Sequence, residues 1–404
     1  MSTLFTVFLL GWLILSKSPS LGSIILGIHA LTMGLFLPGY YFLGFYDEGY
    51  QIQSIYSYLM FDILVFIQLF LTTILVRNFK IESSVGSKFT LHSPFLNSYS
   101  ILGIAVFAMF FFSMLMRFNG LEPYYLSIFV GLALESEYIS RADRTVGQGA
   151  FLFSFIFDYV IPALCLNCLS VSKNIIVKSL AIAILTMSVL TMGTKFPIIV
   201  VLMWLIYKKL SDKIWIIDWK FYLRVGLFLI MTFFLYLFVK MSFGDGQPYE
   251  TLGWALYSFI RRILAGSVIA GLVGIDYFGF DFFDGVEHLK HSVWSLVYGR
   301  IGGSATLPIV VNMFLSQGVI LGFLAFSGLC VLARYSYIYV LILANYNPRY
   351  RTLLLFPFFH LMMTFAFSGH FEFFLRLLGI LVFVVLIHFI GKSNFKKKRQ
   401  LEFN

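Results

Sequence analysis

Five short stretches of the chain contain arginine or lysine outside the loops in which most of the basic residues are concentrated. A guanidinium binds two phosphate oxygens at once, whereas a lysine ammonium acts as a point charge. Such groups also stabilise negative charge that develops on a leaving group. The sequence therefore predicts a binding site for an anion such as pyrophosphate. The residues assigned to it are Arg141 and Arg144 in SRADRTVGQG, Lys195 in MGTKFP, Arg261 and Arg262 in FIRRILAG, Arg300 in YGRIGGSAT and Arg376 in HFEFFLRLL.

Lys195 stands out among these cations because its depth in a membrane can be estimated. Only 12 residues separate it from Lys208, which is about 20 Å of helix against a hydrocarbon core of about 30 Å. Gly193 loosens the turn, and Pro197 suits the first turn of the next helix. Free backbone N–H groups at that helix start favour an anion. The alternative is a lysine that extends to the membrane surface.

A pyrophosphate leaving group in a sugar transfer would also require a base for the attacking hydroxyl. Histidine ordinarily titrates near neutral pH, which favours His291 in EHLKHSVW. We assign catalysis to Arg262, His291 and Glu250, and substrate binding to His370 and Glu372 together with the cations above. Each of these residues could instead be a plain loop residue or ion-pair partner, as Glu372 could be for Arg376 four positions later. The other candidates for the base are Glu250, His288, Glu137, Asp143, His370 and Glu372.

The elements that position these residues are membrane-spanning helices. The chain has 404 residues, of which 60% are hydrophobic and only 12% charged, against about 25% charged in soluble domains. This composition excludes a secreted domain, a nucleic-acid binder and a disulfide-stapled scaffold. Because charges in mid-bilayer are costly, they delimit the spans. About eleven helices are expected (roughly 10 to 13), at residues 2–16, 21–45, 54–76, 98–118, 151–171, 175–192, 196–207, 221–241, 317–345, 352–368 and 374–391.

The net charge of +10 reports the orientation of these helices. Alternate loops hold 19 of the 29 basic residues but only four of the 19 acids, and such loops face the cytoplasm. This rule predicts a cytoplasmic C-terminus, an external N-terminus and two large external loops, at about 119–150 and 242–316. The stretch from Ser304 to Gly318 should interrupt the helices, which is tolerated at membrane depth where the backbone lines a cavity.

Standard catalytic and cofactor motifs are not found in the sequence. It contains no Walker loop, HExxH, GxSxG or two-metal carboxylate cluster, and we expect no metal, cofactor or nucleic-acid partner. Cys165 and Cys168 have the spacing of a redox or metal pair, but without a second pair they are expected to be packing residues, as is Cys330.

The pattern of four stretches resembles a known family. MGTKFPIIVVLMWL, the loop opening with FIRR, SATLPIVVNMFLSQGVILGFL and SGHFEFFLRLL look like the bacterial O-antigen polymerase family, the Wzy-type oligosaccharide repeat-unit polymerases. The family's glycine, small hydroxyl and basic triplet falls on Gly193, Thr194 and Lys195, and its external arginines on Arg262, Arg144 and Arg376.

The resemblance implies an all-helical, single-domain, GT-C-like glycosyltransferase of the bacterial inner membrane that needs no metal. Its substrates would be undecaprenyl-pyrophosphate-linked oligosaccharides for lipopolysaccharide or a related surface polysaccharide, joined on the periplasmic face. A chain-length regulator and a flippase are possible partners. Two alternatives stay open. An O-antigen ligase would need one indispensable histidine in the large external loop, which could be His288 or His291. A flippase or transporter would need polar groups through the membrane, and the predicted spans contain few, mainly Asp62, Asp158, His29 and His388.

Overall fold

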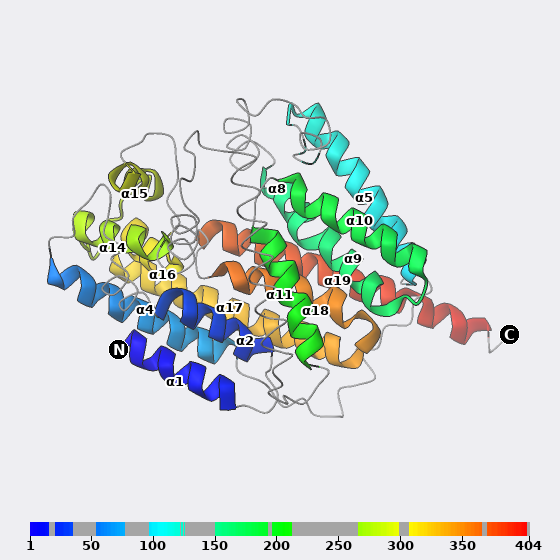
Figure 1. The fold of residues 1–404 in the computed structure, drawn as a ribbon, viewed down its shortest axis with the longest axis horizontal. Helices are drawn as coiled ribbons and strands as arrows, with labels where there is room; N and C mark the ends of the chain where they lie inside the picture. The colour runs from blue at the N-terminus through cyan, green and yellow to red at the C-terminus, as the bar shows by residue number, and fades with distance from the viewer. Residues whose placement is uncertain are drawn as a thin grey trace, which may run out of the picture. The chain divides into compact units, whose positions relative to one another are not determined.

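The computed structural model describes residues 1–15, 21–34, 54–76, 97–121, 123, 125, 150–192, 196–211, 266–298, 307–365 and 370–401. Every regular element in these ranges is helical (Figure 1). The elements are α1 (Ser2–Leu15), α2 (Leu21–His29), the π-helical η1 (Ala30–Gly34), α4 (Ile55–Val76), α5 (Ser98–Phe118), α8 (Ala150–Ser154), the π-helical η5 (Phe155–Val160), α9 (Ile161–Val171), α10 (Ile175–Thr191), α11 (Phe196–Ser211), α14 (Gly266–Phe278), α15 (Leu289–Tyr298), α16 (Ile309–Gln317), α17 (Val319–Tyr346), the 3-10 helix η6 (Pro348–Tyr350), α18 (Arg351–Phe365) and α19 (His370–Leu401).

Five helical stretches within the described ranges are long and apolar enough to cross a membrane. They are Ile55–Val76, Ser98–Phe118, Phe151–Val171, Val319–Tyr346 and Glu372–Ile390. All five coincide with predicted spans to within a few residues, because clusters of charge delimit the apolar runs in the sequence. The all-helical architecture and the apolar helices of a membrane protein are therefore confirmed for the described part of the chain.

The other predicted spans are described only in part. The helices at Ser2–Leu15, Ile175–Thr191, Phe196–Ser211 and Arg351–Phe365 have 14 to 17 residues. The predicted span 21–45 is a helix to His29 and a π-helix to Gly34, and its remainder lies outside the described residues, as does the whole of 221–241. The count of eleven stays a prediction.

The chain divides into two compact units. The first comprises Met1–Arg77, Tyr207–Val331 and Thr364–His370, and the second comprises Asn78–Ile206, Leu332–Met363 and Phe371–Asn404. In the first unit, α1 and α2 pack with α4, and α14 packs with α4, α15 and α16. In the second unit, α5, α9 and α10 lie side by side (Figure 1).

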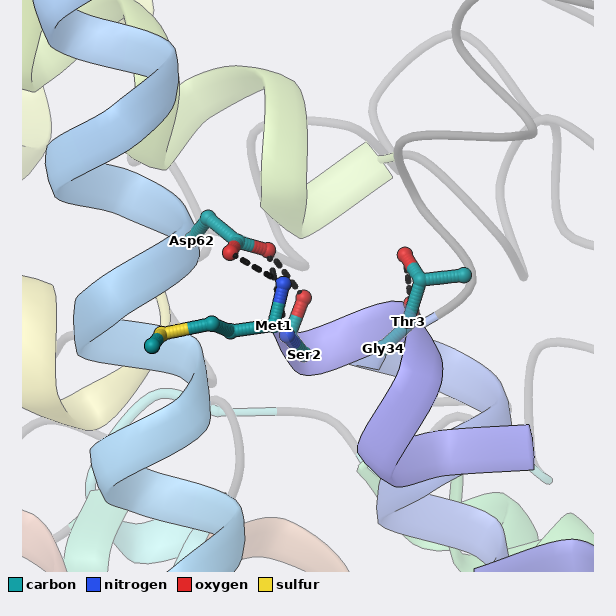
Figure 2. A network of polar contacts seen from close by, with 5 residues as sticks. All are labelled: Met1, Ser2, Thr3, Gly34 and Asp62. Carbon is teal, nitrogen blue, oxygen red and sulfur yellow. Dashed lines mark hydrogen bonds and ion pairs between the residues drawn. The ribbon is translucent and has the colours of Figure 1, made fainter. Parts of the chain in front are cut away.

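The carboxylate of Asp62, which lies within α4, is bonded to the first two residues of the chain, at the start of α1 (Figure 2). The Met1 amine forms an ion pair with its Oδ2 at 3.0 Å, and the Ser2 backbone N–H and hydroxyl both donate to its Oδ1. Thr3 donates from its hydroxyl to the carbonyl of Gly34 at 3.1 Å (Figure 2). These contacts give a structural role to the carboxylate, which would otherwise be costly within an apolar span.

The predicted external loop 242–316 contains packed helices where it is described. Ile269 to Ile275 of α14 are almost fully buried, and so are Ile309 to Leu315 of α16. Neither helix was among the predicted spans, because 13 and 9 residues are too few to cross a bilayer. Their burial comes from packing against α4 and against each other.

The stretch from Ser304 to Gly318, predicted to interrupt the helices, contains the short helix α16, which ends at Gly318. The segment Asp281–Val286, here called the clasp, covers the interruption between α16 and α17. Gly318 has φ +78°, a conformation that favours glycine. The Val286 N–H donates to the carbonyl of Leu315 at 2.7 Å, and the Val319 N–H donates to the carbonyl of Asp281 at 2.9 Å. The clasp thus satisfies backbone groups that the helix break leaves without helical partners.

The turn of the clasp depends on the Asp281 carboxylate. Backbone N–H groups of Phe283 and Asp284 donate to its Oδ1 at 2.9 and 3.1 Å, which lowers the pKa of the carboxyl. A lowered pKa means that the charged form stabilises the fold. This contribution is complete above the ordinary aspartate pKa and is lost as the pH falls through the lowered one.

Asp276 in α14 caps the first turn of α4, and its replacement should lower stability. Its Oδ1 accepts from the Ser54 N–H at 3.1 Å and the Ser57 hydroxyl at 2.6 Å. We expect Asp276→Ala to lower the free energy of unfolding by about 1–2 kcal/mol, as loss of a helix cap does. Thermal unfolding of the purified protein in detergent measures this. Asp276→Asn keeps an acceptor oxygen and should lose less, and equal melting of Asp276→Ala and wild type would contradict the assignment.

Candidate functional site

The described site is built on η5, a π-helical segment within the predicted span 151–171. The Ile161 N–H donates to the carbonyl of Ile156, five residues back instead of four. Pro162 follows at once and has no N–H to donate. In a π-helix the N–H of residue 162 would bond to the carbonyl of Phe157, and in an α-helix to the carbonyl of Asp158. Because Pro162 has no N–H, neither carbonyl receives this bond. The backbone here must find partners elsewhere.

Side chains of two other helices supply those partners. The Ser188 hydroxyl of α10 donates to the carbonyl of Phe157 at 2.5 Å, and Nδ1–H of His360 in α18 donates to the carbonyl of Asp158 at 2.8 Å. His360 is only 2% exposed. A carbonyl only accepts hydrogen bonds, so Nδ1 of His360 carries the proton. The distorted segment η5 thus orients the buried imidazole of His360.

Asp158 places a carboxylate in the same segment. The residue is 6% exposed, and its Oδ2 accepts from the Ser154 hydroxyl at 2.8 Å one turn earlier. Burial of a charged carboxylate costs several kcal/mol unless an opposite charge or hydrogen bonds compensate for it. One hydroxyl does not suffice, which makes the neighbouring cation important.

Tyr159 joins this segment to α18 by aromatic stacking. Its ring centroid lies 4.1 Å from that of His360, with 12° between the planes, and 5.8 Å from that of Phe155. Gly379 of α19 allows the approach, because a Cβ there would lie 2.9 Å from the Phe155 ring. Three neighbouring elements, η5, α18 and α19, thus meet around Tyr159.

Arg376 of α19 brings the positive charge to this cluster. Its Cζ lies 5.9 Å from the centroid of the Tyr159 ring. The guanidinium interacts with the Tyr159 hydroxyl and with the charges of Glu372 and Asp158. Among the described residues, no ion pair joins Arg376 to Glu372. The sequence allowed a simple salt bridge between these two residues, but Arg376 is directed at η5 instead.

This arrangement, here called the buried cluster, consists of the buried Asp158, Tyr159 and His360 and the half-buried Ser154 and Arg376. It combines a carboxylate, an imidazole and a guanidinium in surroundings of low polarity, where electrostatic interactions are stronger than in water. Ionisable groups within a membrane-spanning helix are rare, and they commonly mark substrate or ion sites. The cluster can bind a polar ligand, exchange a proton with it, or stabilise its negative charge.

Three of the residues assigned to the site from sequence have described side chains. Arg376 belongs to the buried cluster, and the exposed Glu372 lies one turn from it. His291 lies exposed on α15, where its N–H donates to the carbonyl of His288, a residue with φ +52°. Arg376 and His291 lie in different compact units. The helix at His370 is described but its side chain is not, and Arg262, Glu250, Lys195, Arg261, Arg141, Arg144 and Arg300 lie outside the described residues.

Ser154, Tyr159 and His360 were missed by the sequence reasoning, and Asp158 was noted only as a charge inside a span. The available signal was an aspartate four residues before a proline in an apolar run. At that spacing the backbone carbonyl of Asp158 receives no hydrogen bond from Pro162, and the Asp158 carboxylate lies on the same residue. Nothing in the sequence shows that the donor comes from His360, which is 202 positions away.

The cysteines occupy packed positions. Cys165 and Cys168 are fully buried, and the Cys168 thiol lies 3.4 Å from the carbonyl of Ser98. Cys330 is buried as well. No group of three or more His, Cys, Asp or Glu side chains gathers like metal ligands within the ranges that the structure describes.

Comparison of the chain with protein-family models, curated proteins and solved structures finds no match.

Proposed function

We propose that the chain is a membrane glycosyltransferase that polymerises undecaprenyl-pyrophosphate-linked oligosaccharide repeats at the periplasmic face of a bacterial inner membrane. The growing glycan is transferred from its carrier to the non-reducing end of a fresh repeat, and undecaprenyl pyrophosphate is released. The eleven spans, the GT-C-like fold and the cytoplasmic C-terminus are parts of the same proposal. It starts from the resemblance of the sequence to the O-antigen polymerases.

The observation that supports this proposal best is the position of Arg376. A guanidinium within an apolar helix is costly unless a ligand or partner repays its desolvation. Arg376 lies four residues after Glu372, where its span begins, which is about 6 Å along the helix. By the predicted orientation this end faces the periplasm. A lipid-linked oligosaccharide repeat whose carrier lies in the outer leaflet can reach a cation at that depth.

A flippase or transporter of lipid-linked oligosaccharide is the second candidate, and the buried cluster favours it. A carboxylate, an imidazole and a guanidinium within helices are typical of substrate and proton pathways. The sequence indicated few interior polar groups, and His360 with Arg376 adds to them. Both candidates use the same class of lipid-linked substrate, so only the product separates them.

A deletion strain distinguishes the candidate functions by the glycan that it accumulates. Loss of a polymerase leaves a single repeat attached to the final acceptor. Loss of a ligase leaves polymer on the lipid carrier, and loss of a flippase leaves single repeats on the cytoplasmic face. Gel separation of surface glycans, together with extraction of carrier lipids, reads out all three. Normal long chains in the deletion strain would refute the proposed function.

Arg262→Ala and Lys195→Ala are each expected to reduce long-chain glycan at least about 100-fold in this strain. Loss of one preorganised group that stabilises transition-state charge has an effect of this size. Single-repeat product and protein amount should stay unchanged. Lys208→Ala, at the predicted cytoplasmic end of α11, serves as the matched control and should restore full chain length. Normal polymer from the Arg262→Ala strain would remove that residue from the site.

A further inference from the structure

Oδ1 of the Asp158 carboxylate and Nε of the Arg376 guanidinium each have no hydrogen-bond partner among the described residues. The Arg376 guanidinium also interacts with the Tyr159 hydroxyl. The two side chains act on each other through their charges, yet no ion pair joins them in the part of the chain that the structure describes. A buried polar atom of a charged side chain is destabilising when it has no hydrogen-bond partner. The pair is therefore incomplete without a third group.

The chemistry of the two atoms defines that third group. A carboxylate oxygen only accepts hydrogen bonds, and a guanidinium nitrogen only donates them. A hydroxyl does both, and its oxygen bonds to each side at about 2.7–2.9 Å. It can therefore bridge two groups that are too far apart for direct contact. A phosphate oxygen suits Arg376 alone, because the Asp158 carboxylate repels it.

We propose that Asp158 and Arg376 bind the hydroxyl of the acceptor sugar and that Asp158 is the general base for the transfer. The inference rests on the proposed function, because the hydroxyl belongs to the lipid-linked repeat. Ser154 holds Oδ2 of the carboxylate at 2.8 Å, which leaves Oδ1 for the substrate. Arg376 orients the hydroxyl oxygen from the other side.

In this step Oδ1 of Asp158 takes the hydroxyl proton while the hydroxyl oxygen forms a bond to the anomeric carbon of the donor. The bond from that carbon to the pyrophosphate oxygen breaks, and its electron pair leaves with undecaprenyl pyrophosphate. Asp158 then returns the proton to the departing pyrophosphate or to water. The step needs no oxidant, reductant or further reactant.

The depth of Asp158 agrees with this role. Asp158 lies seven residues after Phe151, where its span begins, which is about 10 Å along the helix. Both its span and that of Arg376 begin on the side predicted to be external. The two residues therefore lie in the outer half of the membrane, within reach of a repeat unit whose carrier is in the outer leaflet.

The test compares Asp158→Asn with wild type as full-length protein purified in detergent. The probe is the lipid-linked single repeat extracted from the deletion strain, used as both donor and acceptor. We expect Asp158→Asn to lower the rate of polymer formation at least about 100-fold, as loss of a general base does. Binding of the probe should weaken less than about ten-fold, because the amide still bonds to the hydroxyl.

Asp62→Asn is the matched control, because Asp62 is also an aspartate within a predicted span but is bonded to Met1 and Ser2. Its rate should stay within about two-fold of wild type when equal amounts of folded protein are compared. If Asp158→Asn does not accumulate, Ser154→Ala takes its place. That variant removes the hydrogen bond that orients the carboxylate, and its rate should fall about ten-fold.

Wild-type polymerisation by folded Asp158→Asn, or by Ser154→Ala where the asparagine variant does not accumulate, would overturn the inference. It would mean that a water molecule, not a sugar hydroxyl, bridges Asp158 and Arg376. A loss of probe binding as large as the loss of rate would also overturn it, because Asp158 would then only bind the acceptor and would not act as the general base. Failure of the proposed function looks different, because wild-type protein would then make no polymer from the probe.

Discussion

Arg376→Ala is expected to abolish long-chain glycan, with at least about a 100-fold fall in polymer relative to wild type. The guanidinium is the cation of the buried cluster, next to Tyr159 and under the influence of Asp158. Its removal takes away both the proposed partner of the substrate and the charge that compensates for a buried carboxylate. Complementation of the deletion strain, read as the chain-length distribution on a gel, measures the effect.

Loss of stability must be separated from loss of function in this experiment. Arg376→Ala leaves the buried Asp158 carboxylate without a nearby positive charge, so the alanine variant can also reduce the amount of folded protein. Arg376→Lys keeps the charge and loses the planar fork. We expect it to accumulate normally and to make about ten-fold to 100-fold less polymer, since lysine binds an oxygen only as a point charge.

Arg351→Ala is the matched arginine control. Arg351 is exposed at the first position of α18, on the side that the charge pattern assigns to the cytoplasm. Its replacement should leave chain length unchanged. Full-length polymer from Arg376→Lys would show that the bidentate geometry is unimportant, and full-length polymer from Arg376→Ala would exclude the buried cluster from the reaction.

The long helices were predictable because hydropathy and charge act locally along the chain. The boundaries of α4 and α5 follow from the apolar runs 54–76 and 98–118 almost residue for residue. The helices α14 and α16 were not predicted, because each is too short to cross a bilayer alone. Their burial depends on α4, which is more than 180 positions earlier in the sequence. Hydropathy contains no such long-range information.

The candidate site was predictable only in part, for a related reason. Arg376 could be singled out because a cation in an apolar run is unusual. Its partners could not be identified, since Asp158 and His360 come from separate helices. The π-helical distortion at η5 has no hydropathy signal at all. Pro162 was the one local sign that a backbone carbonyl in this span must bond to a side chain.

The second large effect is expected for stability, at Gly285 in the clasp. A Cβ at this position would overlap the carbonyl of Ser316 and lie 2.5 Å from the backbone nitrogen of Gln317. Both obstacles are backbone atoms of a packed helix end, so they cannot rotate away. Gly285→Ala must therefore push the clasp off the end of α16.

That displacement breaks the backbone hydrogen bonds between the clasp and the ends of α16 and α17. The bond from the Val286 N–H to the carbonyl of Leu315 at 2.7 Å lies next to the substituted residue, and the bond from the Val319 N–H to that of Asp281 at 2.9 Å lies at the other end of the clasp. The carbonyl of the buried Leu315 then loses its partner, and a buried backbone group left unpaired costs about 1–3 kcal/mol. We expect Gly285→Ala to lower the free energy of unfolding by about 3 kcal/mol, measured by denaturant or thermal unfolding in detergent.

Gly328→Ala provides the comparison for this substitution, because it lies in α17 and a Cβ there meets nothing within 4 Å. Alanine is a better helix former than glycine by up to about 1 kcal/mol, so this variant should be neutral or more stable than wild type. The contrast isolates the collision at the clasp from any general effect of alanine. If Gly285→Ala and Gly328→Ala unfold alike, the clasp does not hold the break between α16 and α17, and Gly318 alone must accommodate it.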